Sequence, residues 1–106
     1  MTGCNWGDVV LVDLGMAAKV RPCVVVTVSH TGGQRNMTVV VPMTTEIRGG
    51  EFEVPFVKPP WLRQESVVNL LGIAGVDNAR IERRIAAFPA GKMSEIQDGL
   101  RALLGL

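Results

Sequence analysis

The chain has 106 residues, 47% of them hydrophobic and 20% charged, a composition that predicts one folded domain over residues 1–106 and excludes a disordered segment. The formal net charge of +1 excludes attraction of nucleic acid by overall charge and leaves a local basic groove as the electrostatic route. No apolar run reaches the ~20 residues that span a bilayer, and the N-terminus lacks the pattern of a signal peptide. We therefore expect a cytoplasmic protein that does not associate with membranes.

The first two predicted strands are rich in valine. Residues 7–15 (GDVVLVDLG) predict a strand that begins after Gly7. Residues 17–22 (AAKVRP) are expected to form a connection. Residues 23–29 (CVVVTVS) are apolar on both faces, which favours a central strand.

The middle of the chain alternates turns with strands. Residues 30–36 contain a Gly-Gly pair and predict a hairpin turn. Residues 37–44 (MTVVVPMT) predict a third strand, with Pro42 marking its end or an edge. Residues 51–56 alternate acidic or proline residues with apolar ones, which indicates a strand with one apolar face. Residues 57–65 contain two prolines and are expected to be irregular.

Residues 66–76 (SVVNLLGIAGV) predict one strand, or two short strands broken between Gly72 and Gly75. After them, Asp77 is a candidate N-cap for a short helix whose apolar residues are Ile81 and Ile85.

The last predicted element is a helix capped by Ser94 and ended by Gly105. Its apolar stripe, expected to face the core or another subunit, consists of Ile96, Leu100, Leu103 and Leu104. Five to seven strands followed by a helix predict a mainly β (α+β) fold, a small, partly open barrel with the C-terminal helix packed on it.

The cysteine and histidine content argues against a metal site and against any cofactor. The chain has two cysteines and one histidine, His30, and no Cys-x-x-Cys pair. Cys23 lies within a valine run and is predicted to be a buried, reduced thiol.

A charged residue stands unexpectedly at the entrance of the second strand. Pro22 fixes its own φ and biases Arg21 toward an extended backbone, so the guanidinium is projected from a rigid base. A guanidinium there suits a phosphate, because it offers forked hydrogen-bond donors. The alternative is that Arg21 pairs with an acidic neighbour such as Asp8 or Asp13.

Several short motifs, taken together and in order, resemble the PemK/MazF toxin family of bacterial toxin–antitoxin systems. The motifs are WGDVVLVDLG, VRPCVVVT, VPMTTEI, QESVVNL, VDNARI and the closing LLGL. The resemblance covers nearly the whole chain. It implies an SH3-like barrel, a homodimer, and cleavage of single-stranded RNA without a metal ion. It also implies a cognate antitoxin whose acidic, disordered segment covers the active groove.

The resemblance implies specific site residues. The family's catalytic arginine, which precedes a proline at the second strand, falls on Arg21, and its catalytic threonine falls on Thr44. The further residues expected to contact RNA are Lys19, Thr45, Arg48, Trp61, Ser66, Asp77 and Arg80. Among these, Ser66, Asp77 and Arg80 match positions of the family pattern, whereas Trp61 is a candidate because its ring can stack on a base.

The sequence also departs from the family pattern. The loop before Arg21 is short and lacks the family's polar residues, and Leu71, Gly72, Ala74 and Gly75 stand where polar residues are usual. These changes support an alternative, a non-catalytic module on the same fold that binds RNA, DNA or a protein. A gyrase-poison version of this alternative is disfavoured, because the chain lacks a C-terminal Trp-Gly-Ile.

The general base is left open by the sequence. Arginine is a poor base because its pKa is above ~12. His30, Asp13 and Glu46 are candidates, and their spacing brings none of them to Arg21.

Overall fold

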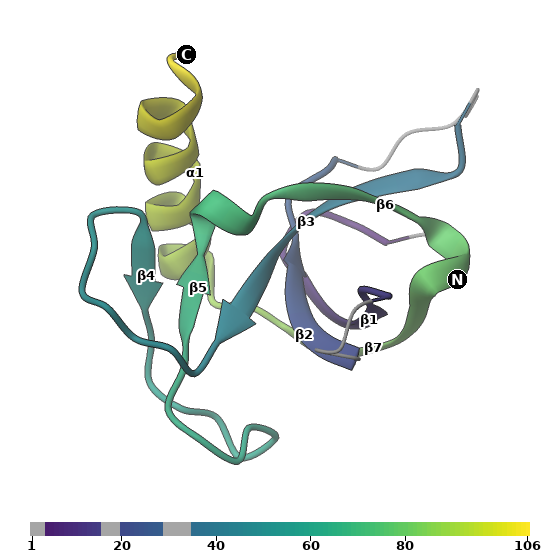
Figure 1. Cartoon of the computed structure of the whole chain (residues 1–106), viewed down its shortest axis with the longest axis horizontal. Helices are drawn as coiled ribbons and strands as arrows, with labels where there is room; N and C mark the ends of the chain where they lie inside the picture. The colour runs from purple at the N-terminus through teal and green to yellow at the C-terminus, as the bar shows by residue number, and fades with distance from the viewer. Residues whose placement is uncertain (1–3, 16–19, 29–34) are drawn as a thin grey trace.

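The computed structural model of the chain describes residues 4–15, 20–28 and 35–106. Lys19, His30 and the predicted Gly-Gly turn lie outside the described residues. In the described part, seven antiparallel strands form one open sheet, and a single α-helix follows them (Figure 1). The elements are β1 (Asp8–Asp13), β2 (Val20–Val25), β3 (Met37–Thr44), β4 (Glu53–Pro55), β5 (Val67–Asn69), η1 (Leu70–Gly72), β6 (Ala74–Asp77), η2 (Asn78–Arg80), β7 (Ile81–Ala87) and α1 (Ala90–Leu104).

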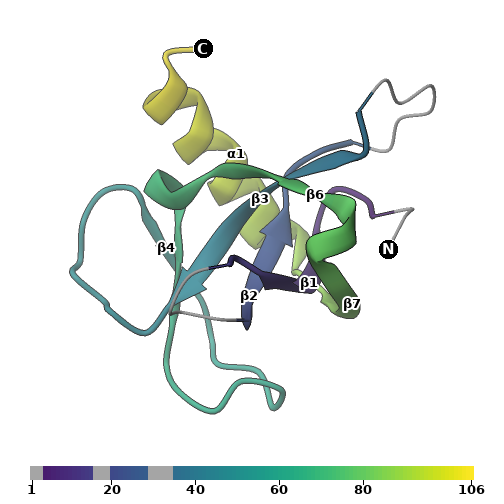
Figure 2. The same ribbon diagram turned by 45° about the vertical axis from the view of Figure 1, so that its right-hand side comes forward.

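The strand β3 joins the two parts of the sheet. Its first half, Met37–Val40, pairs with β6, and its end, Met43 and Thr44, pairs with β5. On the other side β3 pairs with β2, and the order continues through β1 to β7. Figure 2 shows β3 running from the curved part formed by β1, β2, β6 and β7 to the small part that carries β4. The prediction of a partly open barrel with a C-terminal helix is confirmed.

Pro42 does not end β3, which continues to Thr44. It lies between the residues that pair with β6 and those that pair with β5, so on that side β3 has no ladder partner at Pro42. A residue without an N–H is tolerated at such a local edge.

The sheet buries apolar side chains on both of its faces. Alternate residues of β2 divide between two cores: Val24 packs with Val9 and Val41 against helix α1, whereas Cys23 packs with Val10 inside the curved part. Because side chains of a strand alternate, a strand buried on both faces must be apolar throughout. This explains the run of valines that follows Cys23.

The prediction of a helix after Asp77 is wrong. Asp77 does act as a cap, since its carboxylate accepts a hydrogen bond from the amide of Ala79 at 2.9 Å, but it caps only the single 3-10 turn η2. From Ile81 the chain is the strand β7, which pairs with β1. The four-residue spacing of Ile81 and Ile85 fits one face of a helix. In β7 the register with β1 shifts between them, so Ile81 lies in the core of the curved part and Ile85 packs on the helix-facing core.

The helix α1 begins four residues before its predicted cap. Its N-cap is Pro89, and Ser94 lies inside the helix. The earlier start adds Met93 to the buried stripe formed with Ile96 and Leu100. At the other end Gly105 adopts φ 73°, a left-handed conformation that ends the helix as predicted.

The strand β2 begins at Val20, three residues before the predicted start. Val20, Arg21 and Pro22 pair with β1 opposite Asp13, Val12 and Leu11. The Arg-Pro pair is therefore part of the sheet and not a connection before it.

Candidate functional site

Arg21 and Thr44 stand at neighbouring ends of β2 and β3. In the register of the two strands, Cys23 lies opposite Pro42, and Val24 lies opposite Val41. The pairing of these two strands ends at Cys23 and Pro42, and Arg21 and Thr44 each lie two residues beyond this last pair. Pro22 holds the strand that carries Arg21 through its pairing with Leu11.

The guanidinium of Arg21 has no ion-pair partner within the described residues. Asp8, one of the acidic neighbours considered from the sequence, pairs instead with Arg84 at 2.8 Å. Asp13, the other, accepts a hydrogen bond from the amide of Gly15 at 2.8 Å. The half-buried side chain of Arg21 thus keeps its donors available for an anion.

The charge of Arg21 acts on the buried thiol two residues away. Burial raises the pKa of Cys23 to about 12, while the positive charge of Arg21 works in the lowering direction. Cys23 is fully buried, as the sequence predicts, and stays a neutral thiol at ordinary pH.

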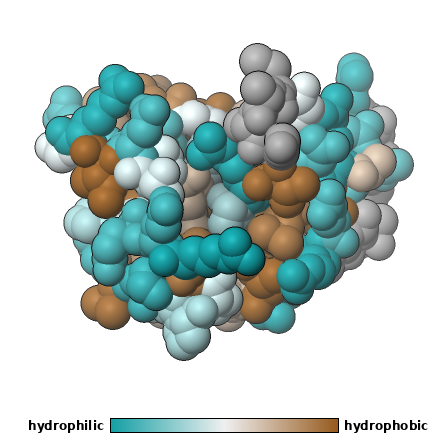
Figure 3. All heavy atoms as spheres, turned by 60° about the horizontal axis from the view of Figure 1, so that its bottom comes forward, coloured by the Kyte–Doolittle hydropathy of each residue, from teal (hydrophilic) through white to brown (hydrophobic). Residues whose placement is uncertain are grey.

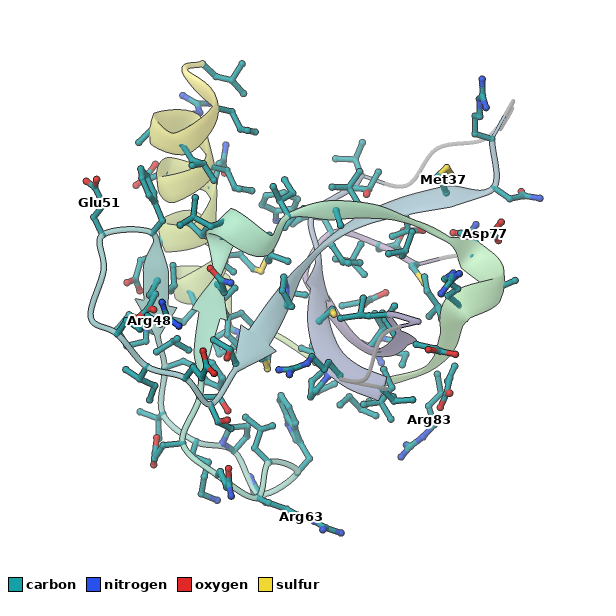
Figure 4. The ribbon with its side chains drawn as sticks, in the orientation of Figure 1. Met37, Arg48, Glu51, Arg63, Asp77 and Arg83 are labelled. Atoms are coloured by element: carbon teal, nitrogen blue, oxygen red, sulfur yellow. The ribbon has the colours of Figure 1, made fainter. Side chains whose placement is uncertain are left out.

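Arg21 lines a groove of about 640 Å³, here called the arginine groove, on the lower side of the molecule in Figure 4. Three arginines line it: Arg21 from β2, Arg63 from the β4–β5 loop, and Arg83 from β7. Figure 3 views this end of the molecule and shows hydrophilic side chains crossing a face that also exposes hydrophobic residues. No carboxylate is among the described residues that line the groove.

The remaining wall of the arginine groove combines polar groups with one indole ring. Thr45, Trp61, Gln64 and Ser66 line it together with apolar residues of β1, β2 and β3. Trp61 is half-buried because one side of it packs on the helix-facing core. Ser66 is buried and donates its hydroxyl hydrogen bond to the carbonyl of Gln64 at 3.2 Å.

Thr44 lines a second groove, of about 520 Å³, here called the loop groove. The β3–β4 loop forms one wall with Glu46 and Arg48, and Asn69 and Leu71 form another. Arg48 is exposed and forms an ion pair with Glu46 at 3.1 Å. The hydroxyl of Thr44 accepts a hydrogen bond from the amide of Glu46 at 3.1 Å.

The backbone of the β3–β4 loop is held by Glu53. Its carboxylate accepts hydrogen bonds from the amides of Arg48 and Gly49, the shortest at 2.9 Å. Gly49 has φ +72°, which turns its amide toward the same carboxylate as the preceding one. The loop beside Thr44 is therefore fixed by the residue that begins β4.

Asp77 and Arg80 line neither groove. Asp77 caps η2, and Arg80 donates a hydrogen bond to the carbonyl of Asp13 at 3.4 Å, with its guanidinium against Gly15. The structure thus brings Arg21, Thr45, Trp61 and Ser66 to one groove, and Thr44 and Arg48 to the next.

The sequence of residues 5–104 matches the family described as the PemK-like, MazF-like toxin of type II toxin–antitoxin systems. The chain belongs to this toxin family. No curated protein sequence matches it.

Solved structures of MazF-type toxins share the fold. MazF from Deinococcus radiodurans (Form-I) has a TM-score of 0.82 and 24% identity, and all of each chain is covered. The MazE–MazF structure (Form-I) from the same organism has a TM-score of 0.76 and 27% identity, again over all of each chain. An endoribonuclease in complex with its cognate antitoxin, from a Mycobacterial species, has a TM-score of 0.81 and 22% identity, covering 98% of this chain and 97% of that one.

Three polar residues of the arginine groove, Arg63, Gln64 and Arg83, are not predicted from the sequence. Arg83 lies where the sequence predicts a short helix after Asp77, whereas residues 81–87 form a strand that turns this side chain to the groove. Arg63 and Gln64 lie in an irregular loop, where no periodicity signals the direction of a side chain.

A third groove of the toxin, of about 640 Å³, is apolar and is here called the helix groove. It runs between α1 and the sheet, and Trp6, Val28, Ile73, Leu104 and Leu106 line it. Trp6 is 37% exposed, and Leu104 is 51% exposed.

Two further properties bear on what the toxin binds. Among the described residues, no group of three or more His, Cys, Asp and Glu side chains is placed to hold a metal ion. No described helix has the length and apolar character that crossing a membrane requires.

Proposed function

We propose that this toxin is an endoribonuclease that cleaves single-stranded RNA without a metal ion, with Arg21 and Thr44 as its catalytic residues. The observation that carries the proposal is the position of Arg21, which lines a groove with two further arginines and has no carboxylate partner in the described residues. A guanidinium held on a strand and left unpaired is suited to an anionic substrate.

The proposed reaction uses the 2′-hydroxyl of the ribose as the nucleophile. Its oxygen bonds to phosphorus, the bond from phosphorus to the 5′-oxygen breaks, and the products end in a 2′,3′-cyclic phosphate and a 5′-hydroxyl. Arg21 stabilises the negative charge that develops on the phosphate oxygens, and the hydroxyl of Thr44 donates a further hydrogen bond to the same phosphate.

The reaction also needs a base for the 2′-hydroxyl proton and an acid for the leaving oxygen. Of the two described carboxylates considered from the sequence, Asp13 binds the backbone of Gly15, whereas Glu46 lines the loop groove with Thr44. Glu46 is therefore the carboxylate to test first as the base.

The proposal extends to RNA contacts, partners and location. Lys19, Thr45, Arg48, Trp61, Ser66, Asp77 and Arg80 remain proposed RNA contacts, although Asp77 and Arg80 already have intramolecular roles. We expect a cognate antitoxin whose acidic segment competes with RNA, and we expect the toxin to act in the cytoplasm. A second copy of the chain is proposed to cover the helix groove, because that groove is lined almost entirely by apolar side chains.

One observation favours a second candidate function, a module that binds nucleic acid or protein and cleaves nothing. Leu71 is 68% exposed and lines the loop groove beside Thr44, where the family pattern has a polar residue. A groove that lacks this polar group keeps its binding residues and loses part of the set that orients the substrate.

The test is cleavage of a long mixed-sequence RNA by purified protein in excess chelator, beside Arg21→Ala. We expect cleavage at a few sites by the wild type, ends that carry 2′,3′-cyclic phosphate, and a loss of at least about a hundredfold in the variant. A folded wild type that binds RNA and never cleaves it would favour the binding module. Cleavage by Arg21→Ala at the wild-type rate would remove Arg21 from the mechanism.

A further inference from the structure

We infer that Arg63 and Arg83 are backbone-binding residues that hold single-stranded nucleic acid in the arginine groove, and that they determine affinity while Arg21 determines chemistry. This inference rests on the proposed function, because it takes RNA as the natural ligand. The two residues belong to distant parts of the chain and meet only in the fold.

The two side chains extend toward the same space. Figure 4 shows Arg63 extending from the lower end of the β4–β5 loop and Arg83 extending downward from β7, and both line the arginine groove. Arg83 reaches the groove because it pairs with Leu11, which also lines it, whereas the next residue, Arg84, forms its ion pair with Asp8. Because successive side chains of β7 point to opposite faces, Arg84 lies beside Asp8 while Arg83 points to the groove.

The charges of the groove are not balanced within the described part of the protein. Arg48 and Arg84 have carboxylate partners, and Arg80 is bonded to a carbonyl. Arg21, Arg63 and Arg83 have no such partner there, and no described carboxylate lines their groove. Like charges in one groove repel each other. An anionic ligand removes this repulsion, which makes its binding free energy more favourable.

The chemistry of the groove favours a nucleic acid over an acidic peptide. Trp61 offers a ring on which a base can stack, and Gln64 and Thr45 offer hydrogen bonds beside it. A guanidinium fork matches the paired oxygens of a phosphate, and successive phosphates carry charge at every residue of the ligand. A single-stranded nucleic acid that binds Arg21 would therefore also contact Arg63 and Arg83.

The experiment measures binding of a fluorescein-labelled, mixed-sequence single-stranded DNA over a range of KCl concentrations. DNA lacks the 2′-hydroxyl and cannot be cleaved, so binding is separated from chemistry. The variants are Arg63→Gln, Arg83→Gln, the double variant, and Arg63→Lys with Arg83→Lys to restore charge. The matched control is Arg35→Gln, an exposed arginine near the start of β3, at the opposite end of that strand from the groove.

Each glutamine variant is expected to weaken binding roughly tenfold and to lower the slope of log K against log salt by about 0.7. The double variant is expected to lower the slope by about twice that amount, the lysine variants to restore it, and Arg35→Gln to leave it unchanged. On cleavable RNA, the glutamine variants raise KM with little change in kcat.

Glutamine variants that bind DNA as Arg35→Gln does would overturn the inference. So would variants that keep DNA binding and lose affinity for a glutamate-rich peptide, because the groove would then serve a protein partner. Failure of the proposed function looks different: the wild type cleaves no RNA, while the order of DNA affinities among the variants is retained.

Discussion

At the scale of single residues, the two cysteines differ in how far a reagent can reach their thiols. Cys23 is 0% exposed and its pKa is raised to about 12 by burial, so almost no thiolate exists at pH 8. Cys4 is half-buried, and its pKa is raised by burial and by the charge of Asp8.

We expect iodoacetamide at pH 8 to alkylate Cys4 in the native protein and to leave Cys23 unmodified. Peptide mass spectrometry over time measures both rates, and a sample in denaturant, where both thiols are exposed, is the control. Equal rates at the two residues in the native protein would contradict the buried position of Cys23.

The residues of the candidate site differ in how well the sequence alone could indicate them. Arg21 is marked by the proline after it and by the buried strand that follows, both local features. Arg63 and Arg83 carry no such mark, because their shared position depends on a loop and a strand that meet only in the fold. Arg80 was expected to contact RNA from its position in the family pattern. In the structure it binds the carbonyl of Asp13, a residue 67 positions away that no local pattern links to it.

At the scale of elements, the contact between α1 and η1 leaves no room for a side chain at Gly99. A Cβ at this position would clash with Cδ1 of Leu70. Leu70 is fully buried, so its side chain cannot move away at low cost.

We expect Gly99→Ala to lower the free energy of unfolding by about 1–3 kcal/mol, although alanine has the higher helix propensity. The matched control is Gly91→Ala in the first turn of the same helix, where nothing lies within 4 Å of the added atom. Urea denaturation of both variants measures the difference. A Gly99→Ala protein as stable as Gly91→Ala would show that α1 packs less closely on η1.

A second element-scale prediction concerns the loop held by Glu53. Glu53→Ala removes the acceptor for the amides of Arg48 and Gly49. We expect the free energy of local opening of this loop to fall by roughly 1 kcal/mol, so that those amides exchange about fivefold faster. Glu51→Ala, in the same loop and exposed, is the control. Hydrogen exchange followed by NMR tests this, and unchanged protection of both amides would contradict it.

The error at residues 77–87 shows where element prediction from this sequence stops. Asp77 carries a true capping signal, and the isoleucines four residues apart fit a helix. In β7 the two isoleucines lie in different cores, and the deciding interaction is the pairing of β7 with β1, about seventy residues earlier in the chain. A signal that distant is absent from any local window of the sequence.

At the scale of the whole molecule, β3 explains why the site lies where it does. The first half of β3 pairs with β6 and its end pairs with β5, so β3 connects the two parts of the sheet. The end of β3 lies near the start of β2. The strands before Asp77 and the final helix were predictable from hydrophobic patterns and turn residues. The exchange of partners along β3 was not, because periodicity within one strand carries no information on its neighbours.

The helix groove provides the whole-molecule prediction. A second copy that covers it would place Leu104 of both protomers in one interface. A substitution there would therefore bury two charges, one from each protomer. We expect the wild type to have the mass of a dimer by light scattering at micromolar concentration, and Leu104→Glu to have the mass of a folded monomer. Val57→Glu is the control, because Val57 is 91% exposed and lies in the β4–β5 connection, outside the helix groove. A Leu104→Glu protein that remains dimeric would place the interface elsewhere, and a wild type that is monomeric at this concentration would leave the groove for the antitoxin.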